Sequence, residues 1–161
     1  MRHKDREIKD FSKIAQIIRE LPIGHLAMID GDQPYGVTMN YDAEIEDGIV
    51  TLYFHGAKEG RRPEIWKRNP AVYFFAERDD GEKDVVMPNG RRNQTTYYVS
   101  VAGSGVMEEI TDLAEKRKRL AAMVAKFFPT PMDALPDAMI QAVGVWKLIL
   151  RNPTGKSNPP C

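Results

Sequence analysis

The chain has 161 residues, of which 42% are hydrophobic, and this length suits one domain with a substantial core. It carries 23 basic and 23 acidic residues, so no net positive field exists to attract nucleic acid or an anionic membrane. The one cysteine, Cys161, excludes a disulfide framework or a cysteine-based zinc site, and a reducing cytoplasm is the expected compartment. No segment has the pattern of a secretory signal or a membrane span.

Hydrophobic periodicity and turn residues divide the chain into short strands and a few helices. Apolar residues recur every three or four positions until Pro22, which is typical of an amphipathic helix. Asp-Gly pairs stand between β-prone runs, as they do in hairpin turns. In chain order these signals predict a helix over 11–21, strands over 23–29, 34–44 and 48–55, a short helix around Pro63, strands over 71–79 and 95–110, helices over 111–128 and 132–141, and a strand over 142–151.

The predicted elements form one domain that is mainly β with flanking helices. About six strands joined mostly by hairpins favour an antiparallel sheet, which can hide its edges by closing into a barrel. We expect this domain to span residues 1–151, followed by a mobile tail over 152–161. The polar segment from Asp79 to Asn93 is either a loop or the tip of a long hairpin.

One strand–helix junction concentrates residues that suit an anion. In "LYFHGAKEGRR" a predicted strand ends at His55, and Lys58, Arg61 and Arg62 come just before a helix. The first turn of a helix has free N–H groups and the positive end of the helix dipole, and arginine can hold a phosphate through two parallel hydrogen bonds. The alternative is that the three cations only solvate an exposed helix and that His55 packs at the end of its strand. The glycine-rich patterns of the common phosphate loops are both absent.

Residues elsewhere give weaker functional signals. His25 lies on an apolar strand and is expected to be structural, and the three histidines lack metal-ligand spacing, so no metal site is expected. The basic run over 116–119 lies on the polar face of a predicted helix, where solvation is the expected role rather than RNA binding.

Four segments resemble the FMN-binding split-barrel proteins related to pyridoxamine 5'-phosphate oxidase. These are "MRHKDREIKDF", "YGVTMNY", "LYFHGAKEGRR" and "YYVSVAGSGVMEE", and within the group they are most similar to the 5-nitroimidazole resistance (Nim-type) proteins. The resemblance covers nearly the whole chain, is most specific in "YFHGAKEGR", and weakens from Asp79 to Asn93. It implies a six-stranded antiparallel split β-barrel, and a homodimer whose protomers share each flavin site and act on a small molecule.

The resemblance also implies which residues meet the FMN. Lys58, Arg61 and Arg62 would hold the phosphate, and His55 would face both flavin and substrate as a catalytic proton donor or positioning group. The implied set also contains close backbone contacts at Gly56 and Ala57, and the segment Val37, Thr38, Met39 and Asn40 along the isoalloxazine ring. Two further candidates come from the residues themselves. Ser100 could hydrogen-bond a flavin edge or merely face solvent, and Trp146 could reach a flavin, pack across a dimer interface or belong to the core.

The function implied by the resemblance is that of an FMN-dependent oxidoreductase reducing nitro groups on small aromatic rings. The C-terminal segment lacks the WGGYR-like and RLH-like motifs of pyridoxamine 5'-phosphate oxidases proper, so vitamin B6 oxidation is not expected. Two alternatives stay open. One is a split barrel that binds flavin, or haem through His55, without catalysis; the other is a barrel that binds RNA or protein through its basic helix.

Overall fold

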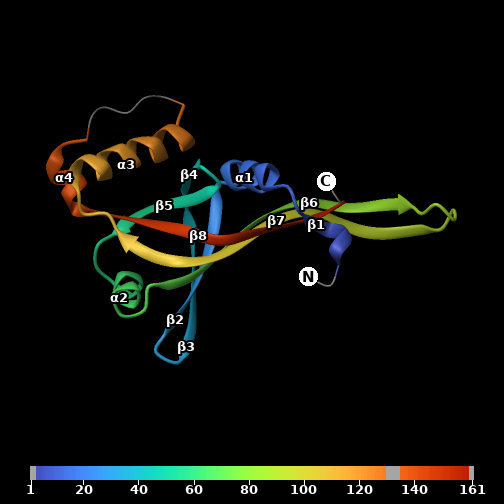
Figure 1. The fold of residues 1–161 in the computed structure, drawn as a ribbon, viewed down its shortest axis with the longest axis horizontal. Coiled ribbons are helices and arrows are strands. Elements are labelled where there is room, and N and C mark those ends of the chain that lie inside the picture. Colours follow the sequence, from blue (N-terminus) through green and yellow to red (C-terminus); the bar gives the residue numbers. More distant parts are fainter. Residues whose placement is uncertain (1–2, 130–134, 160–161) are drawn as a thin grey trace.

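A twisted antiparallel sheet forms the body of the molecule. The computed structural model describes residues 3–129 and 135–159 (Figure 1). Its strands follow the order β3-β2-β6-β7-β8-β5-β4, with β1 added beside β8. The strands are β1 (Glu7–Ile8), β2 (Ile23–Asp30), β3 (Gln33–Asn40), β4 (Asp42–Glu46), β5 (Ile49–Ala57), β6 (Ala71–Val86), β7 (Arg92–Glu109) and β8 (Val143–Asn158). The predicted mainly antiparallel β architecture is confirmed, but the expected number of six strands is wrong, because the sheet has eight.

The second predicted strand, over 34–44, is two strands that separate at Tyr41. Before this residue β3 pairs with β2, and after it β4 pairs with β5, so the chain changes partners there. Tyr41 is fully buried, packs edge-on against Phe74 and donates a 2.7 Å hydrogen bond from its hydroxyl to the Ile18 carbonyl. The anchored side chain therefore marks the corner between the two ends of the sheet.

A long two-stranded arm accounts for most of the segment left open between loop and hairpin. β6 and β7 stay paired out to Val86 and Arg92, so the hairpin alternative is confirmed (Figure 1, right). Within the connecting turn, Met87 N–H donates to the Arg91 carbonyl, and Gly90 has a φ of 77°. Both faces of the arm are largely exposed, so its strands lack the alternation of apolar and polar residues that identifies a half-buried strand.

The predicted tail after residue 151 is strand as far as Asn158. This part of β8 pairs with β7 on one side and with β1 on the other (Glu7 opposite Lys156). The prediction of a mobile tail was wrong for residues 152–158, because proline, glycine and asparagine were taken for a linker. Asn152 instead adopts a left-handed conformation (φ 47°) where the β7–β8 register shifts.

Four α-helices flank the sheet. They are α1 (Phe11–Glu20), α2 (Arg61–Arg68), α3 (Leu113–Phe127) and α4 (Asp137–Ala142), preceded by a single turn of 3₁₀-helix over Lys4–Arg6. Asp10 caps α1 by accepting from Ser12 N–H, and Asp112 caps α3 by accepting from Glu115 N–H. The predicted short helix over 132–141 is α4 at its C-terminal end, and residues 132–134 lie outside the described part. None of the described helices is long and apolar enough to cross a membrane.

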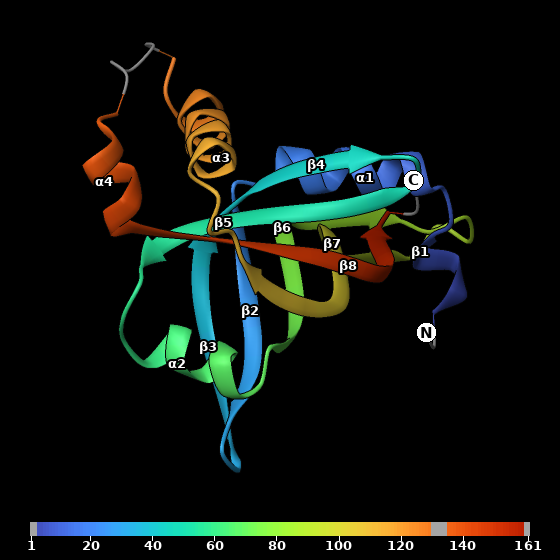
Figure 2. The same ribbon diagram turned by 60° about the vertical axis from the view of Figure 1, so that its left-hand side comes forward.

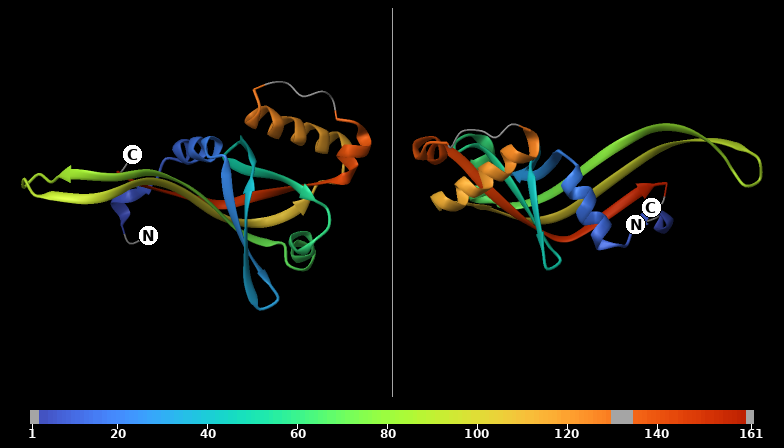
Figure 3. Two further views of the ribbon diagram at one scale, coloured as in Figure 1. Left: turned by 180° about the vertical axis from the view of Figure 1, so that it is seen from behind. Right: turned by 90° about the horizontal axis from the view of Figure 1, so that it is seen from above.

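The helices cover different sides of the β5–β8 pair. α3 and α4 lie on one side and α2 lies on the other (Figures 1 and 3). The main core cluster contains Phe54, Trp66 and Trp146, whereas a smaller cluster beneath α3 contains Tyr53 and Val145. Because successive strand residues point to opposite faces, neighbouring residues of β5 enter these two different environments.

Candidate functional site

Two strand edges remain open where β3 meets β5. Among the described residues β3 pairs only with β2, and β5 beyond Tyr53 pairs only with β8. The backbone groups of residues 37–40 and 54–57 are therefore not used by the sheet on one side, and Figure 2 shows β3 running up to β5 before the chain turns into β4. We call this opening the seam. A flat ligand with hydrogen-bonding edges can pair with such free strand edges.

Arg62 lies on the α2 side of the seam, against a pair of facing glycines. Gly56 and Gly144 stand opposite each other on β5 and β8. A Cβ atom at Gly56 would lie 2.3 Å from Nη2 of Arg62, and one at Gly144 would lie 2.1 Å from the Trp146 ring. Only glycine at both positions leaves space for these side chains.

The Arg62 guanidinium has no counter-charge among the described residues. Its Cζ lies 5.2 Å from the ring centroid of Trp66 and 5.5 Å from that of Trp146, and Nη1 donates to Met39 Sδ at 3.3 Å. Within the part of the chain that the structure describes, the buried Nε atom has no hydrogen-bond partner, and neither does the buried indole Nε1 of Trp66. Burial lowers the pKa of Arg62. Buried donors are normally hydrogen-bonded, and cations with little hydration are normally paired. The environment of Arg62 and Trp66 therefore lacks an acceptor that a bound anion could supply.

Arg61 points away from the core and is held in one orientation. Its Nε donates to Asp30 Oδ2 at 2.8 Å, and its Cζ lies 4.3 Å above the Tyr35 ring. Asp30 also accepts from Arg68 at 2.6 Å. These contacts use the inner nitrogen of Arg61 and leave its two terminal nitrogens without a hydrogen bond among the described residues. The fork that binds a phosphate bidentately is thus available.

The start of α2 adds further donors. Gly60, the residue before the helix, has a φ of 115° and no side-chain cap, so the first N–H groups of α2 are not capped. Lys58 is exposed, forms no ion pair in the described chain, and lines a small cavity of about 150 Å³ beside Trp66 and Trp146. Uncapped N–H groups and Lys58 thus stand next to the two arginines in the chain, and binding of an anion by this junction stays a prediction.

His55 lies on the other face of β5, under α3. Together with Asn40 it lines a cavity of about 400 Å³, and we call this space the α3 cavity. Neither side chain has a hydrogen-bond partner in the part of the chain that the structure describes. His55 is exposed overall, but partial burial and then the charge of Arg62 lower its pKa below the ordinary value. The other described lining residues are apolar: Leu120, Met123, Val124, Phe127, Phe128, Leu135 and Val143.

The predicted ring-contact segment divides between two faces. Met39 is buried and Val37 packs against the main core, so only the side chains of Thr38 and Asn40 point outward. Thr38 already shares a 3.2 Å hydrogen bond with His25 Nδ1, whose Nε2 lies 3.0 Å from Glu77. The expectation that His25 is a satisfied structural histidine is confirmed.

Of the other predicted contacts, Ser100 lies away from this cluster, and Trp146 lies in the core beside Arg62. Ser100 is opposite Lys156 near the far end of β8, whereas His55 is opposite Val145 near its start, so one protomer does not bring Ser100 to the seam. Trp146 is 4% exposed and packs edge-on against Trp66 at 5.2 Å, which places it in the core. Gly56 and Ala57 do lie at the seam, at the end of β5.

Two residues of the basic run on α3 have a structural role that was not predicted from the sequence. Lys116 and Arg119 are buried, so the solvation reading is wrong for them. Arg119 makes a bidentate ion pair with Glu44 (2.9 and 2.8 Å), donates to Glu115 at 2.6 Å, and lies 3.8 Å above the Tyr53 ring. These contacts hold α3, which covers one side of the α3 cavity, against β4 and β5. Lys116 falls on the apolar face at helical spacing from Leu113 and Leu120, but this spacing alone does not show that it is buried.

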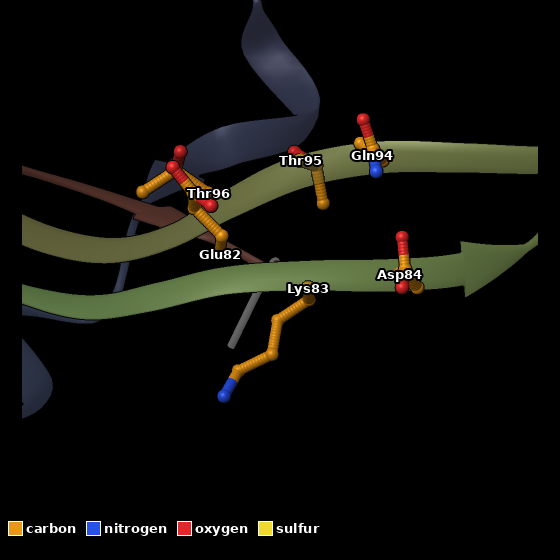
Figure 4. Close-up of a pocket in the computed structure, with 6 residues that line it drawn as sticks. All are labelled: Glu82, Lys83, Asp84, Gln94, Thr95 and Thr96. Carbon is orange, nitrogen blue, oxygen red and sulfur yellow. The ribbon is translucent and has the colours of Figure 1, made fainter.

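Cavity volume alone does not identify the site. A polar recess of about 420 Å³ lies on the arm, where side chains of residues 82–84 on β6 and 94–96 on β7 face solvent (Figure 4). It has no aromatic wall and lies far along β6 from the seam (Figure 1). A flavin ring would find no apolar surface there.

Comparisons with known proteins agree with this architecture. The sequence model of the family described as pyridoxamine 5'-phosphate oxidase matches residues 10–156. The chain belongs to this family. The solved structure of a protein described as a 5-nitroimidazole antibiotic resistance protein, from Bacteroides thetaiotaomicron VPI-5482, is 28% identical over 94% of this chain and 86% of its own, with a TM-score of 0.78.

More distant structures share the fold. The flavocytochrome Anf3 of Azotobacter vinelandii is 19% identical, covers 98% of this chain and 71% of its own, and has a TM-score of 0.78. A FAD and heme binding protein of Mycobacterium smegmatis is 16% identical, covers 94% and 73%, and has a TM-score of 0.79. A search of curated proteins gave no significant match. The fold of this pyridoxamine 5'-phosphate oxidase family member is therefore the split barrel of its relatives.

The residues present fit a flavin phosphate. The uncapped start of α2, the free nitrogens of Arg61, the exposed Lys58 and the partnerless Arg62 together supply the donors that a phosphate dianion accepts. The open edge of β3 supplies backbone groups for the polar edge of the ring.

Proposed function

We propose that this protein binds FMN in the seam, with its phosphate at the start of α2, and reduces small nitroaromatic compounds. The observation that carries the proposal is a pair of buried donors without acceptors among the described residues, Arg62 Nε and Trp66 Nε1, next to Arg61, whose exposed terminal nitrogens bond no described residue. A chain that stabilised itself alone would pair or remove such groups. The likeness to the 5-nitroimidazole resistance protein supports the choice of substrate.

In this proposal, residues of the chain bind the flavin, orient the acceptor and protonate it. Bound flavin supplies the electrons. Asp30 and Tyr35 hold Arg61 so that its fork faces the phosphate. His55 lies at the α3 cavity with a free ring, and from there it hydrogen-bonds the acceptor and delivers a proton to it. His55 and Asn40 are exposed to solvent, so the acceptor can reach them directly.

Visible absorption after incubation with FMN and desalting tests the cofactor. We expect flavin bands in the wild-type protein and their loss in the Lys58→Ala/Arg61→Ala variant, because charge-assisted hydrogen bonds to the phosphate are each worth about 1.5–3 kcal/mol. An Arg92→Ala variant on the distant arm is the matched control and should retain the bands. Protein that stays colourless with FMN would remove the proposal.

The second candidate function is a flavin- or haem-binding protein without catalysis. The observation that favours it is the free side chain of His55, which could ligate iron, and the two distant structures named as a flavocytochrome and as a FAD and heme binding protein. A Soret band in protein as isolated would support haem. Flavin retention without nitroarene turnover in the presence of a reductant would support the non-catalytic flavoprotein.

A homodimer is the further part of the proposal. β2, β6 and β7 present a sheet face that no described helix covers, and its exposed apolar residues are Ile23, Ile29, Tyr73, Phe75 and Val106. A second copy of the chain is the occupant that the family resemblance favours, and such a face is typical of an interface between subunits.

A further inference from the structure

The α3 cavity is asymmetric in a way that selects its ligand. Its polar groups, His55 and Asn40, come from the sheet, whereas Met123, Val124 and Phe127 come from the helix. The ligand therefore meets hydrogen-bonding groups on one side and an apolar surface on the other. Ligand sites are commonly built in this way, from a few placed polar groups in an apolar wall.

The charge of the lining limits the ligand further. No Asp, Glu, Lys or Arg belongs to the described lining, and the basic groups of α3 are turned elsewhere: Lys116 donates to the Val143 carbonyl, and Arg119 is held by Glu44. His55 and Asn40 are exposed, but a charged molecule packed against the apolar wall would lose part of its hydration without a counter-charge in the described lining. Asn40 and His55 each offer a donor and an acceptor, so they suit a neutral ring nitrogen, amide or nitro group.

The size of the cavity favours a ligand larger than a single small ring. At about 400 Å³ it falls in the lower part of the range of roughly 300–1,000 Å³ for pockets that bury drug-sized molecules. A single small ring would leave much of the apolar wall uncovered and would lose its dispersion contacts. Two fused aromatic rings with one polar substituent match both the volume and the two-sided lining.

We propose that the α3 cavity binds a neutral, flat aromatic molecule of about two fused rings, hydrogen-bonded to His55 and Asn40 beneath α3. This inference depends on the proposed function in one respect only, namely that the bound molecule is the electron acceptor. The specificity of the protein is then set by α3, an element outside the junction sequence that suggested the cofactor.

The test is equilibrium binding measured by titration calorimetry on the full chain, with and without saturating FMN. The probes are quinoline-2-carboxamide, which is neutral and carries no nitro group, and its charged analogues quinoline-2-carboxylate and N-methylquinolinium. We expect the neutral probe to bind, and the charged probes to bind about tenfold more weakly or worse.

Two α3 variants localise the probe. Val124 lines the cavity, so Val124→Phe fills it and should weaken the probe about tenfold or more. Ala125 is exposed and lies outside the lining, so Ala125→Phe should leave binding unchanged and controls for helix stability. Both variants should bind as much FMN as the wild-type protein. This result would show that the cavity can be changed without affecting the phosphate site.

Each outcome decides the inference separately from the cofactor proposal. Probe binding that Val124→Phe does not weaken, or that Ala125→Phe weakens equally, would overturn it even if FMN binds. Displacement of the probe by FMN would also overturn it, because the cavity would then be the seat of the flavin ring. Probe binding sensitive to Val124→Phe in a protein that fails to take up FMN would support the cavity and refute the flavin.

Discussion

Arg62 carries the clearest conflict between stability and function. The side chain is confined between two indole rings and Gly56, and it has no carboxylate partner among the described residues. Arg62 is half-buried, and its Nε atom is fully buried. A cation that loses hydration without gaining a carboxylate partner destabilises a fold, and an apolar replacement of similar length is often neutral or stabilising. Such a group persists where a ligand completes it.

We expect Arg62→Met to raise or preserve the melting temperature of the cofactor-free protein while weakening FMN about 10- to 100-fold. The physical reason is that one change removes both a desolvated charge and a phosphate donor. Thermal unfolding and a fluorescence titration with FMN measure the two effects. If FMN affinity stays at the wild-type value, Arg62 is only a core cation and the phosphate site consists of Lys58, Arg61 and α2.

A residue-scale prediction for pH follows from His55. Its pKa lies below the ordinary value, so the protonated ring forms only as the solution becomes more acidic than about pH 6.5. If the imidazolium donates the proton, nitroarene turnover rises as the pH falls through this lowered pKa. His55→Gln keeps a hydrogen bond but cannot titrate, so it should lose this rise and about 10²-fold or more in rate.

The pH–rate profile at saturating FMN checks both statements. A His25→Gln variant is the matched histidine control, since His25 bonds Thr38 and Glu77 away from the α3 cavity. An unchanged acid rise in His55→Gln would mean that another group delivers the proton.

At the scale of elements, α3 is held by charge as much as by apolar packing. Arg119 joins it to Glu44 on β4, and Arg117 reaches Asp137 and the Leu135 carbonyl ahead of α4. The hydrogen bonds from Arg119 lower the pKa of Glu44 in the folded state. The roof of the α3 cavity therefore depends on an ionised carboxylate.

The Glu44–Arg119 pair predicts a specific loss of stability in acid. A carboxyl whose folded pKa is below its unfolded value stabilises the fold above the unfolded pKa, and this contribution is lost as the pH falls through the folded pKa. Glu44→Gln should reduce the free energy of unfolding by about 1–3 kcal/mol at pH 7, and the difference from wild type should shrink below about pH 4.5.

Urea unfolding between pH 3 and pH 7 measures this difference. Glu46 lies on the same strand, is exposed and has no ion pair among the described residues, so Glu46→Gln is the control. A Glu44→Gln deficit that is equally large at pH 3 would assign the effect to packing instead of charge.

The sequence predicted best those elements whose signals are local. The periodicity of α1 and α3, the Asp caps and the cations beside Gly56 and Gly60 are all readable within a few residues. The arm was left open between loop and hairpin, and the end of β8 was missed, because these strands are exposed or contain turn residues and only pairing with distant segments defines them.

The candidate site was predicted as a list of residues but not as a geometry. Alternation along β5 puts His55 and the Arg62 environment on opposite faces, and this follows from the register with β8. The roles of Lys116 and Arg119 depend on Val143 and Glu44, which are distant in sequence. No pattern on α3 alone distinguishes a buried cation from a solvated one.

For the whole molecule, the uncovered sheet face predicts self-association. Tyr73 is 50% exposed and stands opposite two small residues, Ala27 and Ser104. Tyr73→Arg would place a charge in the proposed interface, where it would be desolvated without a partner, so we expect a shift from dimer to monomer. Sedimentation velocity measures the mass directly.

The matched control is Ile49→Arg, because Ile49 is 53% exposed but lies at the β4–β5 hairpin. A wild-type protein that sediments as a monomer at all concentrations would refute the interface. So would a dimer that both variants leave intact.

The unpartnered guanidinium of Arg62 also has a consequence for the life of the protein in a cell. A ligand present at 100 times its Kd adds about 2.7 kcal/mol to the stability of a chain that binds it only when folded. The polypeptide without FMN would unfold more often and be cleared faster by proteases, which act on the unfolded population. The amount of this protein would then follow the riboflavin supply even at a constant rate of synthesis, so a nutritional shortage would reduce both the cofactor and its carrier.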